Sequence, residues 1–199
     1  MNLPNKITLT RIFMIPIFVA IFFLDGIIPF AFGIAAIIFA LAACTDFIDG
    51  HIARSRGLVT NLGKFLDPIA DKVLVSTAML LILTMKESLF NKFPVCSDAL
   101  YIATAVCICV IMARELIISA FRQIAATRGL VMAADKLGKY KTTFQDISIF
   151  ILIFSTSITA GVGCILAMVG FALFAVATVL TVWSGISYVV KNKQVLKDN

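Results

Sequence analysis

The sequence predicts an all-α protein that crosses a membrane several times, and its composition carries that prediction. Of the 199 residues, 61% are hydrophobic and only 14% are charged. Soluble domains carry about 25% charged residues. The mean hydropathy is +1.04. A soluble chain of this length could not bury so much apolar surface, so a polytopic membrane protein is expected.

Six apolar runs are long enough to be membrane-spanning helices, which need about 20 mostly apolar residues each. The expected spans are residues 7–24, 28–44, 68–85, 100–121, 144–160 and 165–190. The second helix is expected to continue to Arg56. The expected breaks fall at Asp25-Gly26 with Pro29, Gly57, Pro94, Gly129, and Gly161 with Gly163. We find no repeat or second domain, so residues 1–199 are expected to form one transmembrane domain.

The basic residues predict how these helices are oriented. The first and fifth connections contain no Lys or Arg, and the third contains only Lys86 and Lys92. The two terminal segments and the second and fourth connections hold nearly all the others. Because basic residues collect on the cytoplasmic side, both termini are expected there. The same rule accounts for the net charge of +6 without a nucleic-acid partner.

Four aspartates suggest a functional centre at the cytoplasmic membrane surface. Asp46 and Asp49 are three residues apart at the end of the second predicted span, and Asp67 and Asp71 are four apart at the start of the third. These spacings place each pair on one helical face. Since the connection between the two spans is short, the spans are expected to be antiparallel neighbours whose acidic faces meet.

Four carboxylates at a membrane boundary repel one another, and each one costs about 2.5–3.5 kcal/mol to insert. Proton uptake could relieve this repulsion, but divalent cations relieve it better. Oxygen ligands favour magnesium, manganese or calcium over zinc, and four carboxylates could bridge two ions. The alternative is that these residues only cap helices or anchor interfaces, and Asp67 followed by Pro68 has the pattern of a helix cap.

Two residues beside the aspartates extend this reading. The guanidinium of Arg54 suits a phosphate oxygen, although it could equally be an ordinary cytoplasmic positive charge. Gly50 would let a ligand approach the backbone, or let two helices pack closely. Metal ions on a diphosphate, with a carboxylate base, indicate phosphoryl transfer. A lipid diphosphate could keep its acyl chains in the bilayer and place its head group on the metals.

The spacing of these residues resembles the signature of the CDP-alcohol phosphotransferase family. The pattern is Asp46-x2-Asp49-Gly50-x2-Ala53-Arg54-x8-Gly63-x3-Asp67-x3-Asp71, and every fixed position matches. The opening residues 3–11 also resemble the family's N-terminal segment. The stretch 113–116, Arg122 and residues 138–143 resemble bacterial phosphatidylglycerophosphate synthases.

The resemblance implies a reaction and a role for each matching residue. CDP-diacylglycerol and sn-glycerol 3-phosphate would give phosphatidylglycerophosphate and CMP. Asp46, Asp49, Asp67 and Asp71 would hold magnesium or manganese, probably as two ions, and Asp71 would also be the general base. The CDP-lipid site would be formed by Asn5, Thr8, Gly50, Ala53, Arg54, Thr60 and Gly63. Family members are often homodimers, so a homodimer is expected.

Cations are needed for the phosphate of the acceptor, and several lie on the expected cytoplasmic side. The candidates are Arg114, Arg122, Lys139 and Lys141, with Lys136 less favoured. Arg114 lies within an apolar run, where a charge must be paired or functional. An ion pair with Glu115 is the alternative. Because adjacent helical residues do not face each other well, we favour a functional role.

Three other functions fit parts of this pattern. A synthase of the same family could use inositol phosphate, serine or phosphatidylglycerol as its acceptor. A membrane prenyltransferase also binds magnesium and diphosphate through aspartates, but at other spacings. A divalent-cation transporter would need polar residues near the bilayer midplane, whereas these carboxylates are expected at one surface.

Overall fold

The structure, a computed structural model, describes residues 3–55, 61–127 and 136–192 of the chain, with side chains for 8–45, 66, 69–125, 138–159 and 161–192. These residues form six α-helices and one short 3-10 helix, with no strand among them. The elements are α1 (Leu3–Phe22), α2 (Ala31–Ser55), α3 (Asn61–Thr84), η1 (Phe90–Lys92), α4 (Ser97–Thr127), α5 (Lys136–Ser155) and α6 (Ala160–Lys191). The prediction of an all-α fold is confirmed.

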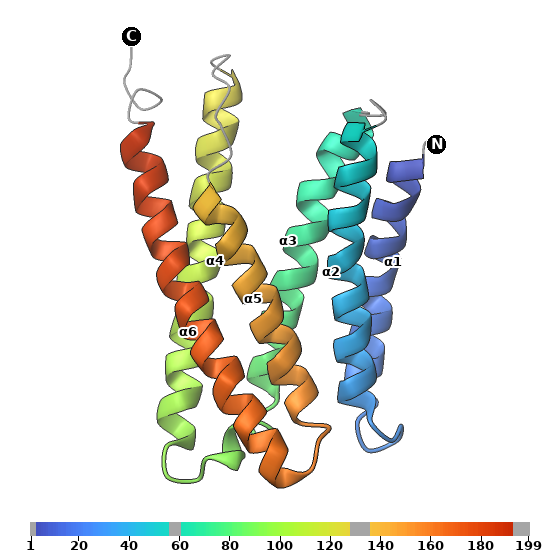
Figure 1. Cartoon of the computed structure of the whole chain (residues 1–199), viewed down its shortest axis with the longest axis vertical. Coiled ribbons are helices and arrows are strands. Elements are labelled where there is room, and N and C mark those ends of the chain that lie inside the picture. Colours follow the sequence, from blue (N-terminus) through green and yellow to red (C-terminus); the bar gives the residue numbers. More distant parts are fainter. Residues whose placement is uncertain (1–2, 56–60, 128–135, 193–199) are drawn as a thin grey trace.

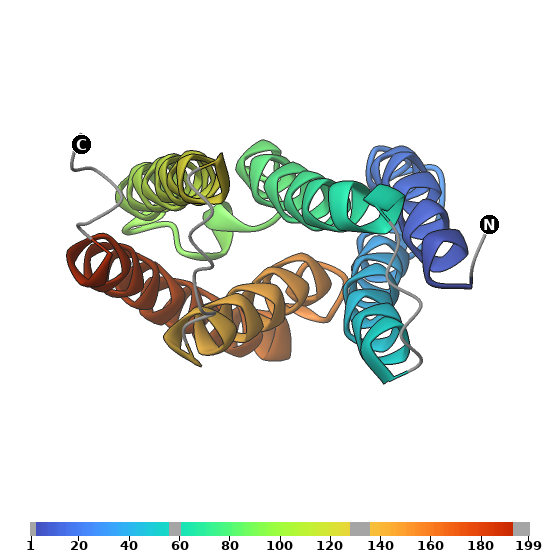
Figure 2. The same ribbon diagram turned by 90° about the horizontal axis from the view of Figure 1, so that it is seen from above.

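The helices run alternately up and down in one bundle (Figure 1). The start of α1 and the end of α6 therefore lie at the same end, which we call the upper end. The end of α2 and the start of α3 also lie there, as do the end of α4 and the start of α5. Viewed from above, α3 and α4 form one side of the bundle, α5 and α6 face them, and α1 and α2 close one end (Figure 2).

Within the described residues, two helices are long and apolar enough to cross a membrane. Residues Ser97–Ala125 of α4 have a mean hydropathy of 2.1, and Gly161–Lys191 of α6 have 2.5. Thr8–Phe22 and Ala31–Thr45 form shorter apolar helices. Large apolar side chains lie exposed on both long helices, among them Leu116 and Trp183. Such exposure indicates a lipid environment, because exposed apolar surface of this extent is unfavourable in water.

The hydrophobic core draws buried residues from all six α-helices, with aromatic contacts at the α1–α2 interface. Phe18 is fully buried, and its ring centroid lies 6.0 Å from that of Phe39. Ile82 on α3 and Leu152 on α5 are buried in the same cluster. Burying a side chain of this kind contributes about 1.5–3 kcal/mol when the alternative is water. In a bilayer the close packing itself contributes, because lipid tails are as apolar as the core.

Several helix bounds differ from those that the sequence predicts. Helix α3 begins at Asn61 and α5 at Lys136, so both extend beyond their apolar runs at the upper end. Asp67 is therefore inside α3 and does not cap it, which corrects the capping alternative. Apolar composition marks only the part of a helix that meets lipid. Polar residues can continue the same helix into the interface.

The break predicted at Gly161 and Gly163 is also misplaced. Both glycines lie in the first turn of α6, and α5 ends at Ser155 rather than at residue 160. At the lower end, Lys92 Nζ lies 2.6 Å from the Ser155 carbonyl oxygen, to which it donates a hydrogen bond. Burial lowers the pKa of Lys92. This cation stabilises the end of α5, where helix carbonyls lack helical partners.

Gly163 leaves room for that contact, and its replacement gives a test of the packing. A Cβ atom at Gly163 would lie 2.6 Å from the Ser155 carbonyl oxygen and 2.8 Å from Lys92 Nζ. We expect Gly163→Ala to destabilise the protein by roughly 1–3 kcal/mol, the usual effect of overpacking. The measurement is the midpoint of thermal unfolding in detergent.

Gly161→Ala is the matched control, because a Cβ atom there would meet nothing within 4 Å. Alanine favours a helix over glycine by about 1 kcal/mol, so the midpoint of thermal unfolding should stay unchanged or increase. Equal midpoints for the two variants would contradict the packing described around Lys92.

Candidate functional site

The backbone places the four predicted aspartates at matching depths on neighbouring helices. Asp49 precedes the end of α2 by as many residues as Asp67 follows the start of α3. Asp46 and Asp71 lie about one turn deeper on the same two helices. With a rise of about 1.5 Å per residue, both pairs lie about 9–15 Å from their helix ends. Since α2 and α3 pack together, this agrees with the predicted meeting of two acidic segments.

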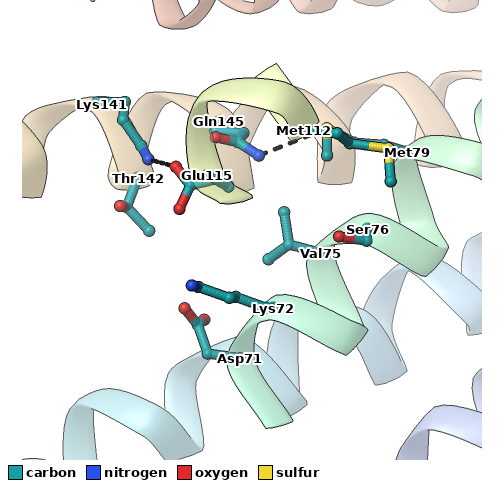
Figure 3. A pocket seen from close by; sticks show the side chains of 10 residues that line it. All are labelled: Asp71, Lys72, Val75, Ser76, Met79, Met112, Glu115, Lys141, Thr142 and Gln145. Carbon is teal, nitrogen blue, oxygen red and sulfur yellow. Dashed lines mark hydrogen bonds and ion pairs between the residues drawn. The ribbon is translucent and has the colours of Figure 1, made fainter. Parts of the chain in front are cut away.

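A polar cavity opens beside Asp71, between α3, α4 and α5 (Figure 3). Its volume is about 390 Å³, counted with its opening to solvent. The lining residues are Asp71, Lys72, Val75, Ser76, Met79, Met112, Glu115, Lys141, Thr142 and Gln145. Two carboxylates and two ammonium groups thus meet in a bundle whose helices are otherwise largely apolar. A cavity of this composition suits a small, charged, hydroxylated molecule.

Lys141 is the predicted acceptor residue that the structure brings to Asp71. Lys141 is 5% exposed, and its ammonium group donates a hydrogen bond to Glu115 Oε1 across the α4–α5 interface. On the opposite wall, Lys72 donates to the Ser119 hydroxyl. The side chain of Asp71 points into the same space (Figure 3). The cavity can therefore present a carboxylate and a cation to one bound molecule.

Arg114 is next to Glu115 on α4 and contacts its carboxylate. Its Nη1 is 3.1 Å from Glu115 Oε1, and its Nη2 donates to the Ser184 hydroxyl on α6 at 2.8 Å. The expectation that these neighbouring residues would not pair is wrong. Backbone directions diverge for adjacent residues, but both side chains are long enough to bend back to each other. Arg114 belongs to the α4–α6 contact, and it is not among the described residues that line the cavity.

Two other predicted acceptor residues also lie outside the cavity lining. Arg122 Nε donates to the Tyr188 hydroxyl at 3.2 Å, and its guanidinium carbon lies 5.3 Å from the centre of that ring. This arrangement is a cation–π contact between α4 and α6. Lys139 is exposed at the upper end of α5. Both could raise the local concentration of anions, whereas Lys141 is positioned to bind one.

On the first helix, the structure describes Thr8 and a neighbouring arginine. Thr8 is 1% exposed and Arg11 is fully buried. Arg11 Nε donates to the Ala42 carbonyl at 3.2 Å and lies 3.4 Å from Thr45 Oγ1. These bonds join α1 to α2 directly before Asp46. Thr8 and the start of the aspartate motif are therefore in the same part of the bundle.

The remaining predicted site residues are only partly described. Asn5, Asp46, Asp49, Gly50, Ala53, Arg54, Gly63 and Asp67 lie on helices, but their side chains are outside the described residues, and Thr60 is wholly outside them. Within the described side chains, no group of three His, Cys, Asp or Glu residues could hold a metal. Asp71 is the member of the predicted metal set whose side chain is described. The carboxylate oxygens of Asp71, and of the three aspartates predicted beside it, are ligands that a hard divalent cation prefers.

Several cavity residues were not singled out from the sequence. Lys72 counted only as a basic residue of a connection, and Gln145 had no assigned role. Glu115 and Thr142 appeared within the stretches 113–116 and 138–143 that resemble relatives, and Glu115 also as a possible partner of Arg114, but neither was assigned to a site. A polar side chain within an apolar run was the available signal for Glu115 and Gln145. Nothing in the spacing indicated that α3, α4 and α5 would bring them together.

The model of the CDP-alcohol phosphatidyltransferase family matches residues 1–183. The chain belongs to this family. A similar protein of the family, from Bacillus subtilis (strain 168), is 39% identical over 98% of this chain and 97% of its own length. Relatives from Escherichia coli (strain K12) and Salmonella typhimurium (strain LT2) are 39% and 38% identical, each over 94% of this chain and 92% of their length. All three are named CDP-diacylglycerol–glycerol-3-phosphate 3-phosphatidyltransferase.

Family membership connects the aspartate motif to the cavity. The motif ends at Asp71, and Asp71 is where the motif and the described cavity meet. The motif segment of this phosphatidyltransferase lies on α2 and α3, whereas the cavity adds α4 and α5. The two halves of the bundle therefore contribute different groups to the same region.

Proposed function

We propose that the protein is a CDP-diacylglycerol–glycerol-3-phosphate 3-phosphatidyltransferase of phospholipid biosynthesis. It transfers the phosphatidyl group from CDP-diacylglycerol to sn-glycerol 3-phosphate and releases CMP. The observation that carries this proposal is the match to relatives of that name over more than nine-tenths of each chain. The cavity supports it, because a carboxylate and a buried cation face the same polar space.

The reaction joins the glycerol 3-phosphate hydroxyl to phosphorus. The hydroxyl oxygen attacks the phosphorus that bears diacylglycerol, and the bond from that phosphorus to the CMP oxygen breaks. Asp71 accepts the hydroxyl proton, so the attacking oxygen becomes more nucleophilic as the new bond forms. The products are phosphatidylglycerophosphate and CMP. Asp71 suits this role because its side chain faces the cavity in which the acceptor would be held (Figure 3).

Asp46, Asp49, Asp67 and Asp71 would hold two ions of magnesium or manganese. When bound, the ions would neutralise the diphosphate and stabilise the charge on departing CMP. Asn5, Thr8, Gly50, Ala53, Arg54, Thr60 and Gly63 would bind the CDP-lipid head group. This assignment agrees with the burial of Thr8 and the packing of α1 against α2 and α3.

Lys141 would bind the phosphate of the acceptor, supported by Lys139, Arg122 and Arg114 at greater distance. Glycerol 3-phosphate is charged and hydroxylated, which matches the polar lining of the cavity. Thr142 and Gln145 can exchange hydrogen bonds with the glycerol hydroxyls. Serine has a carboxylate but no phosphate, so it would offer the Lys141 ammonium group less negative charge and fewer acceptor oxygens than glycerol 3-phosphate.

The protein would cross the cell membrane six times as a single domain, with the upper end of the bundle at the cytoplasmic face. Basic residues of the second and fourth connections support this orientation. Glycerol 3-phosphate and CDP-lipid would then reach the cavity from the cytoplasm and the bilayer, respectively. A homodimer is also proposed, on the family resemblance alone.

The direct test is release of CMP from CDP-diacylglycerol by the purified protein in detergent. We expect release with magnesium or manganese and glycerol 3-phosphate, and none after chelation of divalent metal. Inositol phosphate, serine and phosphatidylglycerol serve as the other acceptors. Faster release with any of them would refute the proposed acceptor. Metal flux into liposomes without CMP release would indicate a transporter.

Asp71→Asn tests the proposed base. It keeps the size of the side chain but removes its capacity to accept a proton. We expect the rate of CMP release to fall about 10²–10⁴-fold, with the protein still folded in detergent. Asp98→Asn is the control, since Asp98 pairs with Lys86 at 3.0 Å at the lower end and should leave the rate unchanged. Full activity of Asp71→Asn would eliminate the assigned role.

Chemical labelling of Cys96 tests how the bundle is oriented in the membrane. Cys96 is exposed in the connection before α4, at the lower end. A membrane-impermeant maleimide should label it in right-side-out vesicles, and Cys96→Ser should lose that labelling. A cysteine substituted for the exposed Lys191 at the end of α6 should react only in inside-out vesicles. The reverse pattern would place the proposed site on the other face.

A further inference from the structure

Glu115 is the centre of a chain of polar contacts that joins three helices. Its Oε1 accepts a hydrogen bond from Lys141 on α5 and lies 3.1 Å from Arg114 Nη1 on its own helix. Arg114 in turn donates to Ser184 on α6 at 2.8 Å. The order of groups across the bundle is therefore Lys141, Glu115, Arg114 and Ser184. Only the first two line the cavity that contains Asp71.

Lys141 needs such a partner for physical reasons. Its side chain is 7% exposed, and an unpaired ammonium group so deeply buried is strongly disfavoured. A lysine head group also sits on a flexible four-carbon chain, so its position is set by what it binds. The carboxylate of Glu115 supplies a negative charge in direct contact with this ammonium group. Asp71 and Lys72 face the same cavity from α3.

Arg114 is held in a way that directs it toward Glu115 and α6. Gly185 provides the space for this, because a Cβ atom there would lie 3.0 Å from Arg114 Cγ and 3.2 Å from Nε. The arginine stem thus lies against the α6 backbone. Its guanidinium group contacts Glu115 Oε1, the same oxygen that accepts a hydrogen bond from Lys141. Glu115 is therefore the residue of the cavity lining that Arg114 contacts.

We propose that Glu115 is a positioning residue for the acceptor site, holding the Lys141 ammonium group where the acceptor phosphate binds, while Arg114 braces Glu115 from α6. This inference rests on the proposed function and adds to it a residue that touches neither substrate. It also gives Arg114 a different role from a direct phosphate ligand. Binding of the nucleotide-activated lipid, which the motif on α2 and α3 would provide, should depend little on Glu115.

The test compares steady-state constants for the two substrates in purified variants. Glu115→Gln keeps the shape and removes the charge. We expect it to raise KM for glycerol 3-phosphate about tenfold, with kcat and KM for CDP-diacylglycerol within about twofold. Glu115→Asp retains the charge on a shorter stem and should give an intermediate KM. Arg114→Gln should raise the same KM by a smaller factor.

A double-variant cycle asks whether Glu115 acts through Lys141. Lys141→Gln should itself raise KM for glycerol 3-phosphate. Adding Glu115→Gln to Lys141→Gln should then cause no further increase, because the group to be positioned is gone. The control is Glu87→Gln, since Glu87 is exposed at the lower end and accepts a hydrogen bond from Asn91 there. It should leave both KM values unchanged.

Two results would overturn the inference. One is a loss of kcat in Glu115→Gln and Glu115→Asp with KM for glycerol 3-phosphate unchanged. The other is a full further increase in that KM when Glu115→Gln is combined with Lys141→Gln. If Glu115→Gln does not fold, the changes in kcat and in KM for glycerol 3-phosphate are compared in Glu115→Asp and Arg114→Gln instead. Failure of the proposed function is distinct, because the wild-type protein would then release no CMP with glycerol 3-phosphate.

Discussion

The arrangement of this bundle depends on how charged groups are accommodated among apolar helices. A charge that leaves water must be paired, hydrogen-bonded or allowed to reach the interface, because its desolvation costs several kcal/mol. Arg11, Lys141 and Glu115 meet this requirement in different ways. Arg11 binds a carbonyl and a hydroxyl of α2, and Glu115 receives two cations. Each solution joins two helices, so the buried charges also fix how the helices pack.

The same constraint places the reactive region. Apolar side chains fill the interior from the middle of the bundle to its lower end, which leaves charged groups to gather near the upper end. There Asp71 of α3 and Lys141 on the polar first part of α5 line one cavity. In the proposed orientation, this cavity would have water on one side and acyl chains on the other. An enzyme that joins a lipid to a water-soluble acceptor needs access to both.

Much of this fold could be predicted from the sequence, because the run length of apolar residues and the distribution of Lys and Arg reflect the membrane directly. The order of six helices and the pairing of α2 with α3 followed from those patterns. The bounds of α3 and α5 did not, since polar residues such as Lys136 continue a helix without any apolar signal. The turn before α6 was also misjudged. Gly163 allows a close approach to Ser155 there, a tertiary reason that composition does not reveal.

For the candidate site, the sequence indicated Asp71 and Lys141 but not the residues that connect them to the rest of the bundle. Contacts between α4, α5 and α6 arise from tertiary packing, so Glu115 and Ser184 could not be assigned from spacing. Burial also changes how the basic residues should be ranked. An exposed cation such as Lys139 is screened by water and salt, and it contributes mainly to the rate of encounter. A buried cation interacts in a medium of low dielectric constant, where the same charge is worth several times more. In the proposed acceptor site, Lys141 would therefore have the larger capacity to distinguish a phosphorylated acceptor from a neutral one, and the residues that fix its position would contribute to that selectivity.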